Sequence, residues 1–159
     1  MEEYRKMRPH KSVFPSAITD SLRNQAIDKI KFKLLPDDKI IKIILIGSSI
    51  KNSFGEYNQP GFRGSLFSDF DFIIFVEDDY QIPQWLEKEP DGKPFLDDKI
   101  NLAYRNKNFI DDKYDVEIFF LRHSDFNNPI VQEQGELAGI PMSNHTAHKY
   151  LTVYNKMIT

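Results

Sequence analysis

Two pairs of acidic residues alternate with apolar residues along β-rich segments of the 159-residue chain. Phe70 separates Asp69 from Asp71, and Val116 separates Asp115 from Glu117. Successive side chains of a strand point to opposite faces, so each pair shares one face, with alpha carbons about 6–7 Å apart. Carboxylates this close repel each other unless a cation lies between them, and hard divalent cations prefer oxygen ligands. The spacing therefore predicts a site for divalent cations.

The same alternation has a simpler interpretation. In an antiparallel sheet with one face in water, polar residues alternate with apolar ones as a matter of course. Either acidic pair alone is therefore compatible with the solvated face of an edge strand. The two pairs together, combined with the glycine turn described next, favour a site over a solvated face.

A glycine–serine turn, Gly47-Ser48-Ser49, follows directly on an apolar run. Backbone N–H groups and hydroxyls at the end of a strand can hold phosphate oxygens. Such turns more commonly only reverse the chain, and this one lacks the lysine of a Walker-type phosphate loop. Its position before the acidic strand makes it a candidate phosphate-binding turn. Arg63, in the glycine-rich stretch that follows, is either a triphosphate ligand or an ordinary surface arginine.

Composition excludes several classes of function. Hydrophobic residues make up 40% of the chain and charged residues 28%, as in an ordinary globular domain. The formal charge of −3 argues against broad, non-specific nucleic-acid binding, which needs a basic face. The chain has no cysteine, which excludes thiolate metal sites and cysteine nucleophiles. No apolar run approaches the roughly 20 residues needed to span a bilayer, so we expect a soluble cytoplasmic protein without a membrane partner.

Hydrophobic periodicity and Pro/Gly boundaries predict the elements that position these residues. The predicted helices cover residues 16–35, 95–110, 129–138 and 143–156, and the predicted strands cover residues 39–46, 69–77 and 113–122. Residues 1–13 are expected to be a flexible basic arm, and residues 50–68 a long loop beside the site. The fold class is α+β, a small mixed β-sheet flanked by helices, in a single domain over residues 1–159.

Three motifs together resemble the DNA polymerase beta-type nucleotidyltransferase superfamily, especially its minimal stand-alone domains. They are Ile46-Gly47-Ser48, the later Ser68-Asp69-Phe70-Asp71-Phe72, and an acid on a following strand. The segment 129–142 is similar to the short helix ending in Gly-Ile that often follows in that family. The resemblance covers residues 40–142 and departs from the family at one point, because 20 residues separate Ser48 from Asp69 and lengthen the usual interval.

The resemblance implies a nucleotidyltransferase-like fold and the transfer of a nucleoside monophosphate from a triphosphate, ATP first, to a hydroxyl, with release of pyrophosphate. Asp69 and Asp71 would bind two Mg²⁺ ions. Glu117 or Asp115 would supply the third carboxylate. The residues around Glu117 match slightly better the family pattern of an acid between hydrophobic residues. The glycine–serine turn would hold the β- and γ-phosphates.

The acceptor stays open at this point: a small molecule, a protein side chain or an RNA end, the last being least compatible with the negative charge. A partner protein or a second copy of the chain is a further expectation from the resemblance. Two other classes of function remain as alternatives. One is a non-catalytic module of this fold that binds a nucleotide or a protein, and the other is a phosphate- or divalent-ion-binding protein without turnover.

Overall fold

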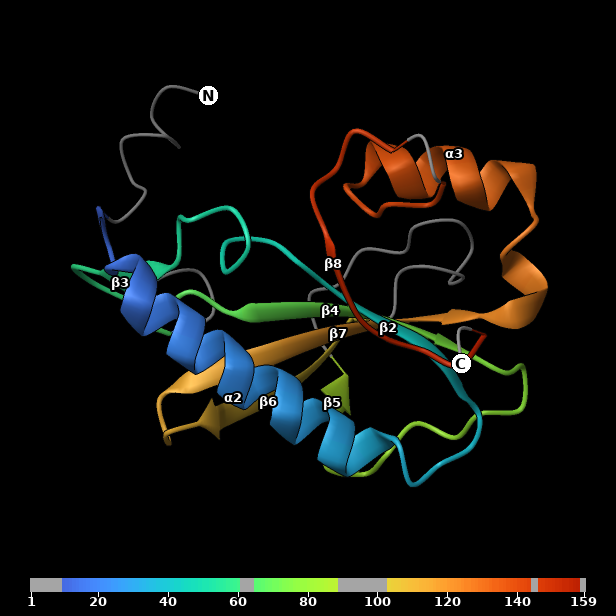
Figure 1. Cartoon of the computed structure of the whole chain (residues 1–159), viewed down its shortest axis with the longest axis horizontal. Helices are drawn as coiled ribbons and strands as arrows, with labels where there is room; N and C mark the ends of the chain where they lie inside the picture. Colours follow the sequence, from blue (N-terminus) through green and yellow to red (C-terminus); the bar gives the residue numbers. More distant parts are fainter. Residues whose placement is uncertain (1–9, 61–64, 89–102, 144–145, 158–159) are drawn as a thin grey trace.

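The computed structural model describes residues 10–60, 65–88, 103–143 and 146–157. The chain forms a mixed α+β fold around a six-stranded sheet (Figure 1). Its elements are β1 (Lys11–Val13), α2 (Ser16–Leu34), β2 (Ile40–Ile46), β3 (Gly55–Tyr57), β4 (Phe70–Val76), β5 (Glu87–Lys88), β6 (Ala103–Ile110), β7 (Tyr114–Arg122), the 3₁₀ turn η2 (His123–Asp125), α3 (Pro129–Leu137) and β8 (Leu151–Asn155). No helix within these ranges is long and apolar enough to cross a membrane.

The main sheet has the strand order β5-β6-β7-β4-β2-β8. β4 and β7 are parallel, and the other neighbouring pairs are antiparallel. Parallel neighbours require a long connection, and here the chain between β4 and β7 contains β5 and β6, which pair beyond β7. The two acid-bearing strands are therefore direct neighbours in the middle of the sheet.

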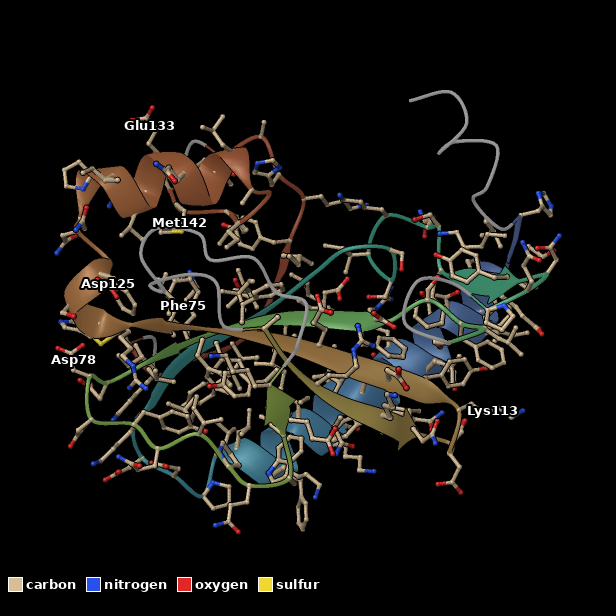
Figure 2. The ribbon with its side chains drawn as sticks, turned by 180° about the vertical axis from the view of Figure 1, so that it is seen from behind. Phe75, Asp78, Lys113, Asp125, Glu133 and Met142 are labelled. Carbon is tan, nitrogen blue, oxygen red and sulfur yellow. The ribbon has the colours of Figure 1, made fainter. Side chains whose placement is uncertain are left out.

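The two faces of the sheet pack against different helices (Figure 1). Phe72 belongs to the larger core, which also contains the apolar face of α2. Its neighbour Ile73 points to the other face and belongs, with Phe75 and Val131 of α3, to a second core. Figure 2 shows Phe75 and Met142 between the sheet and α3. Because both faces are covered, the central strands are apolar on both sides, and a charged residue within them needs a specific reason.

Five of the predicted elements are confirmed, with ends shifted by no more than one residue. They are the helices α2 and α3 and the strands β2, β4 and β7. In α2 the buried apolar residues recur every four positions from Leu22 to Leu34, which is the spacing of one helix face. Asn128 caps α3 by accepting from two backbone N–H groups, and Pro129 opens the helix.

The predicted helix over residues 95–110 is wrong where the structure describes it. Residues 103–110 form β6, antiparallel to β7, and residues 95–102 lie outside the described residues. Asp111 and Asp112 both have positive φ at the centre of a turn that Lys113 N–H closes by donating to the carbonyl of Ile110, as in the type I′ turns of hairpins. The long-range pairing with β7 overrides the weak helical spacing of this segment.

The predicted helix over residues 143–156 is also wrong, because Leu151–Asn155 form β8 along the outer edge of β2. Val153 and Tyr154 pack against the larger core from this edge. A β-branched and an aromatic residue fit a half-buried strand well. Pairing also satisfies backbone groups of β2 that an open edge would leave exposed.

The expected arm and loop are partly ordered against each other. Within residues 1–13, Lys11–Val13 form β1 and pair with β3, which lies inside the expected loop 50–68; residues 1–9 lie outside the described residues. Phe54 is fully buried against Phe70, with ring centroids 4.6 Å apart. Gly55 and Ser68 close the base of the loop through the hydrogen bonds between them. The chain is therefore fixed directly before Asp69.

Candidate active site

The structure brings all four predicted carboxylates to one face of the central sheet. Asp71 of β4 lies opposite Glu117 of β7 in the parallel register, and Phe70 lies opposite Val116. Neighbouring strands are about 4.8 Å apart, and alternation within β7 places Asp115 on the face of Glu117. Asp69 lies directly before β4 and contacts Arg105 together with Glu117 and Asp115. The face that holds these acids packs, further along the strands, against α3. The face thus has an apolar part under α3 and an acidic part beyond it.

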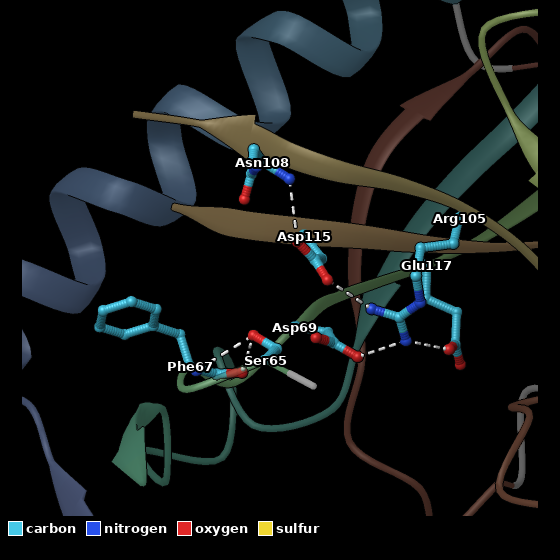
Figure 3. Close-up of polar contacts among 7 residues, drawn as sticks. All are labelled: Ser65, Phe67, Asp69, Arg105, Asn108, Asp115 and Glu117. Carbon is cyan, nitrogen blue, oxygen red and sulfur yellow. Dashed lines mark hydrogen bonds and ion pairs between the residues drawn. The ribbon is translucent and has the colours of Figure 1, made fainter. Parts of the chain in front are cut away.

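Arg105 of β6 joins three of these carboxylates. Its Nη2 donates to Glu117 Oε2 at 2.6 Å and to Asp69 Oδ2 at 2.8 Å, and its Nη1 donates to Asp115 Oδ2 at 3.0 Å (Figure 3). Arg105 is only 5% exposed and lies opposite Glu117 in the antiparallel register. Hydrogen bonds between charged groups are stronger than those between neutral groups. Nη2 joins a carboxylate of β7 to one that lies directly before β4. Arg105 is therefore the centre of the cluster.

Sequence reasoning misses Arg105, because the spacing of apolar residues in this segment predicts a helix over residues 95–110. The signal was present: Ala103, Arg105 and Lys107 alternate with Tyr104 and Asn106 in a segment that pairs with an acidic strand. Opposite charges directly across a strand pair stabilise the pairing. A strand assignment for residues 103–110 would have placed Arg105 beside the acids.

The two acids of β7 differ in their surroundings. Asp115 is 4% exposed, and both of its oxygens have partners: Oδ2 accepts from Arg105, and Oδ1 accepts from the backbone N–H of Asn108 at 2.9 Å. Asp115 thus fixes the β6–β7 hairpin and the guanidinium. Glu117 lies directly beside Asp71, and its Oε2 accepts from Arg105. The geometry favours Glu117 over Asp115 as the carboxylate that acts together with Asp71.

The glycine turn reaches the cluster from the β2 side. Ile46 pairs with Asp71, and Gly47 follows with a φ of +85°. A Cβ at Gly47 would collide with Asp71 Oδ2. Gly47 thus adopts a backbone conformation that L-residues avoid, and a Cβ there would force the Asp71 carboxylate to move. The turn and the acids form one site.

Replacing Gly47 by alanine should destabilise the chain more than the same change at Gly139. Both glycines have positive φ, but nothing lies within 4 Å of a Cβ at Gly139. The conformational cost alone is about 1–2 kcal/mol, which we expect for Gly139→Ala, and the clash with Asp71 adds to it in Gly47→Ala. Urea unfolding of the two variants measures the difference. Equal losses would show that Gly47 and Asp71 are not in contact.

The two serines of the turn are placed differently. Ser48 is half-buried, whereas Ser49 is fully buried. The Ser49 hydroxyl has no hydrogen-bond partner among the described residues, and its carbonyl accepts from Arg23 at 3.0 Å. A side chain without exposed surface does not touch a ligand in this conformation. Of the two hydroxyls, that of Ser48 is thus the phosphate-binding candidate. The predicted ligand Arg63 lies outside the described residues.

The donor atoms suit a divalent cation in type, since carboxylate oxygens are the ligands that Mg²⁺ uses in proteins. In their present positions, no three acidic or histidine side chains of the described part of the chain are grouped around one point as metal ligands. The Arg105 guanidinium lies between these oxygens, with Nη2 at 2.6 Å from Glu117 Oε2 and at 2.8 Å from Asp69 Oδ2. The acids thus offer suitable oxygen ligands on one face of the sheet, and Arg105 would compete with a metal ion for these oxygens.

No protein-family model and no curated protein matches the chain.

Proposed function

We propose that the chain is a divalent-metal-dependent nucleotidyltransferase with a nucleotidyltransferase-like fold, acting in the cytoplasm. It would move a nucleoside monophosphate from a nucleoside triphosphate to an acceptor hydroxyl. ATP is the first candidate for this triphosphate. One observation carries the proposal: carboxylates from β4 and β7 share one sheet face and adjoin a glycine turn that approaches Asp71 as closely as glycine allows. Acids that share a sheet face repel one another unless cations neutralise them, and Arg105 brings one positive charge to the three acids that it contacts.

Asp69, Asp71 and Glu117 would hold the divalent ions, which when bound neutralise and orient the triphosphate. The exposure of these side chains is compatible with this assignment. Asp69 and Asp71 are half-buried and reachable, and Glu117 is 7% exposed directly beside Asp71. Asp115, with both oxygens engaged, positions Arg105 instead. Backbone N–H groups at Gly47 and the Ser48 hydroxyl would hold the outer phosphates.

In the proposed reaction the acceptor hydroxyl gives its proton to a carboxylate, for which Glu117 is the candidate. The oxygen then forms a bond to the α-phosphorus while the bond from that phosphorus to the bridging oxygen breaks. Pyrophosphate leaves with the bonding electrons, opposite the incoming oxygen. In phosphoryl transfer, most of the rate comes from positioning and from neutralising charge.

A non-catalytic binding module is the second candidate, and Arg105 is the observation that favours it. A site that has no cation still has to neutralise its buried acids, and Arg105 does so for three of them. In that case the sheet face would bind a nucleotide or a partner without turnover.

Thermal unfolding in the presence of Mg²⁺ and each of the four nucleoside triphosphates, combined with a pyrophosphate assay, separates the two candidates. The enzyme is stabilised by one or more triphosphates with Mg²⁺, because a ligand that binds only the folded state raises its stability. The enzyme also releases pyrophosphate once an acceptor is present. A cell lysate can supply the acceptor, and labelled triphosphate then shows which molecule receives the nucleotide. Stabilisation without any labelled product would support the binding module. No stabilisation would contradict both the enzyme and a module that binds a nucleotide.

A further inference from the structure

A pocket of about 380 Å³ opens beside the acids, on the side away from the glycine turn. We call it the hairpin pocket. One wall is the segment 65–67, directly before Asp69, and the other is the β6–β7 hairpin, with Lys107, Asn108, Asp112, Lys113 and Asp115. Figure 3 shows Ser65 and Phe67 across from Asn108 and Asp115. Asp115 lines the pocket and also holds Arg105, so the pocket adjoins the carboxylate cluster.

The order of the strands fixes the direction from which a second substrate arrives. From the glycine turn at the end of β2, the sheet runs through β4 and β7 to β6. The acids of β4 and β7 thus lie between the turn on one side and the hairpin pocket on the other. In phosphoryl transfer the attacking and leaving oxygens are roughly in line with the phosphorus. If pyrophosphate leaves toward the glycine turn, the attacking hydroxyl comes from the side of the hairpin pocket.

The charges of the pocket indicate what it binds. Lys107 and Lys113 are exposed, and neither ammonium forms an ion pair with another described residue. Figure 2 shows Lys113 at the tip of the hairpin, at the end of the sheet away from α3. Of the two acids on the wall, Asp115 is already neutralised by Arg105 and by the N–H of Asn108. The lining holds two lysines and two aspartates, so its formal charge is zero. With Asp115 held by Arg105, Lys107 and Lys113 are the groups on the wall that can bind an anion.

The size of the pocket limits the ligand to a small molecule. Small-molecule sites typically measure about 300–1,000 Å³, and this pocket lies near the lower end. Two lysines also do not form the basic track that a nucleic-acid backbone requires. Leu66 and Phe67 add an apolar surface against which a short carbon skeleton can lie.

We infer that the hairpin pocket is the acceptor site, and that the acceptor is a small hydroxyl compound carrying an anionic group, a phosphate or a carboxylate. Lys107 and Lys113 bind that anion, and the hydroxyl points toward the carboxylate cluster. This inference rests on the proposed nucleotidyl transfer for the role of acceptor. The binding of the anion itself does not depend on it.

The test uses the full chain and three probes that share one skeleton: glycerol 3-phosphate, glycerate and glycerol. Binding without triphosphate is followed by the backbone amide signals of the β6–β7 hairpin, compared with those of Gly47 and Ser48. The double variant Lys107→Glu/Lys113→Glu is compared with Lys31→Glu/Lys149→Glu, which changes the net charge equally at residues outside the pocket. Acceptor-dependent pyrophosphate release from ATP and Mg²⁺ is measured in parallel.

We expect at least one charged probe to bind at the hairpin and glycerol not to. Reversing both lysines should weaken this binding at least about tenfold, and the control variant should bind as the unaltered chain does. Comparing the binding of glycerol 3-phosphate with that of glycerate shows whether the pocket prefers a phosphate or a carboxylate. Equal binding by both variants, or binding of the charged probes only at Gly47 and Ser48, would overturn the pocket assignment. Lysine-dependent binding without any transfer would leave the anion site in place and contradict the proposed enzyme instead.

Discussion

Replacing Asp71 by asparagine should lower nucleotidyl transfer at least about 100-fold and leave the fold intact. Asparagine keeps the shape of the side chain but removes the charge that a divalent ion needs. It also relieves the repulsion between Asp71 and its neighbour Glu117, so without Mg²⁺ the variant should be as stable as the unaltered chain or slightly more so. Pyrophosphate release and thermal unfolding with EDTA measure the two effects. We expect Asp69→Asn to lose transfer in the same way.

Asp38→Asn is the matched control, since Asp38 is exposed in the turn before β2, far along the chain from the acids. Its activity and its response to Mg²⁺ should equal those of the unaltered chain. Full activity in both Asp69→Asn and Asp71→Asn would refute the proposed catalytic role of these residues.

Removing the guanidinium of Arg105 should have the largest effect on stability. In Arg105→Met, measured with EDTA, we expect a loss of about 3–5 kcal/mol in the free energy of unfolding, as is typical when one partner of a buried ion pair is removed. The reason is that Asp69, Asp115 and Glu117 lose the cation that joins them. Adding Mg²⁺ should restore part of the loss, because an ion that binds the freed carboxylates stabilises the folded state. Urea unfolding with EDTA and with Mg²⁺ gives both values.

Two further variants make the result interpretable. Arg122→Met removes an arginine of β7 that donates to the carbonyls of Asp78 and Tyr80. This variant should lose less free energy of unfolding than Arg105→Met, and Mg²⁺ should restore none of the loss. Arg105→Lys retains a charge and should fold if Arg105→Met does not. A loss at Arg105 no greater than that at Arg122 would show that the ion pairs contribute little. A loss without rescue by Mg²⁺ would favour the binding module over the enzyme.

The position of Arg105 also connects the two candidate functions. In the absence of a divalent ion, its guanidinium supplies the positive charge that lets acids from two strands share one face. In the presence of an ion, Asp115 can still hold Nη1, since that pair does not involve the bridging nitrogen Nη2. The site therefore has a residue that can remain anchored while the ions take Asp69 and Glu117.

Local sequence patterns determined a large part of this site. The alternation Asp-Phe-Asp and Asp-Val-Glu places each acidic pair on one face, because strand geometry allows nothing else. The four-residue spacing of α2 and the β-branched run of β2 likewise determine those elements. The chemical type of the cluster, oxygen ligands beside a glycine turn, follows from the same residues.

Only the tertiary structure decided which strands are neighbours, and therefore whether the two acidic pairs meet. The parallel register that places Asp71 beside Glu117 joins segments that are far apart in the sequence, with two other strands between them. Pairing with β7 likewise turned residues 103–110 into β6, which carries Arg105 into the cluster, and pairing with β2 made Leu151–Asn155 an edge strand. The tertiary structure also buried Ser49 while leaving Ser48 accessible. Periodicity describes one segment at a time, whereas pairing energy depends on the partner strand, and strand propensity is set by that context.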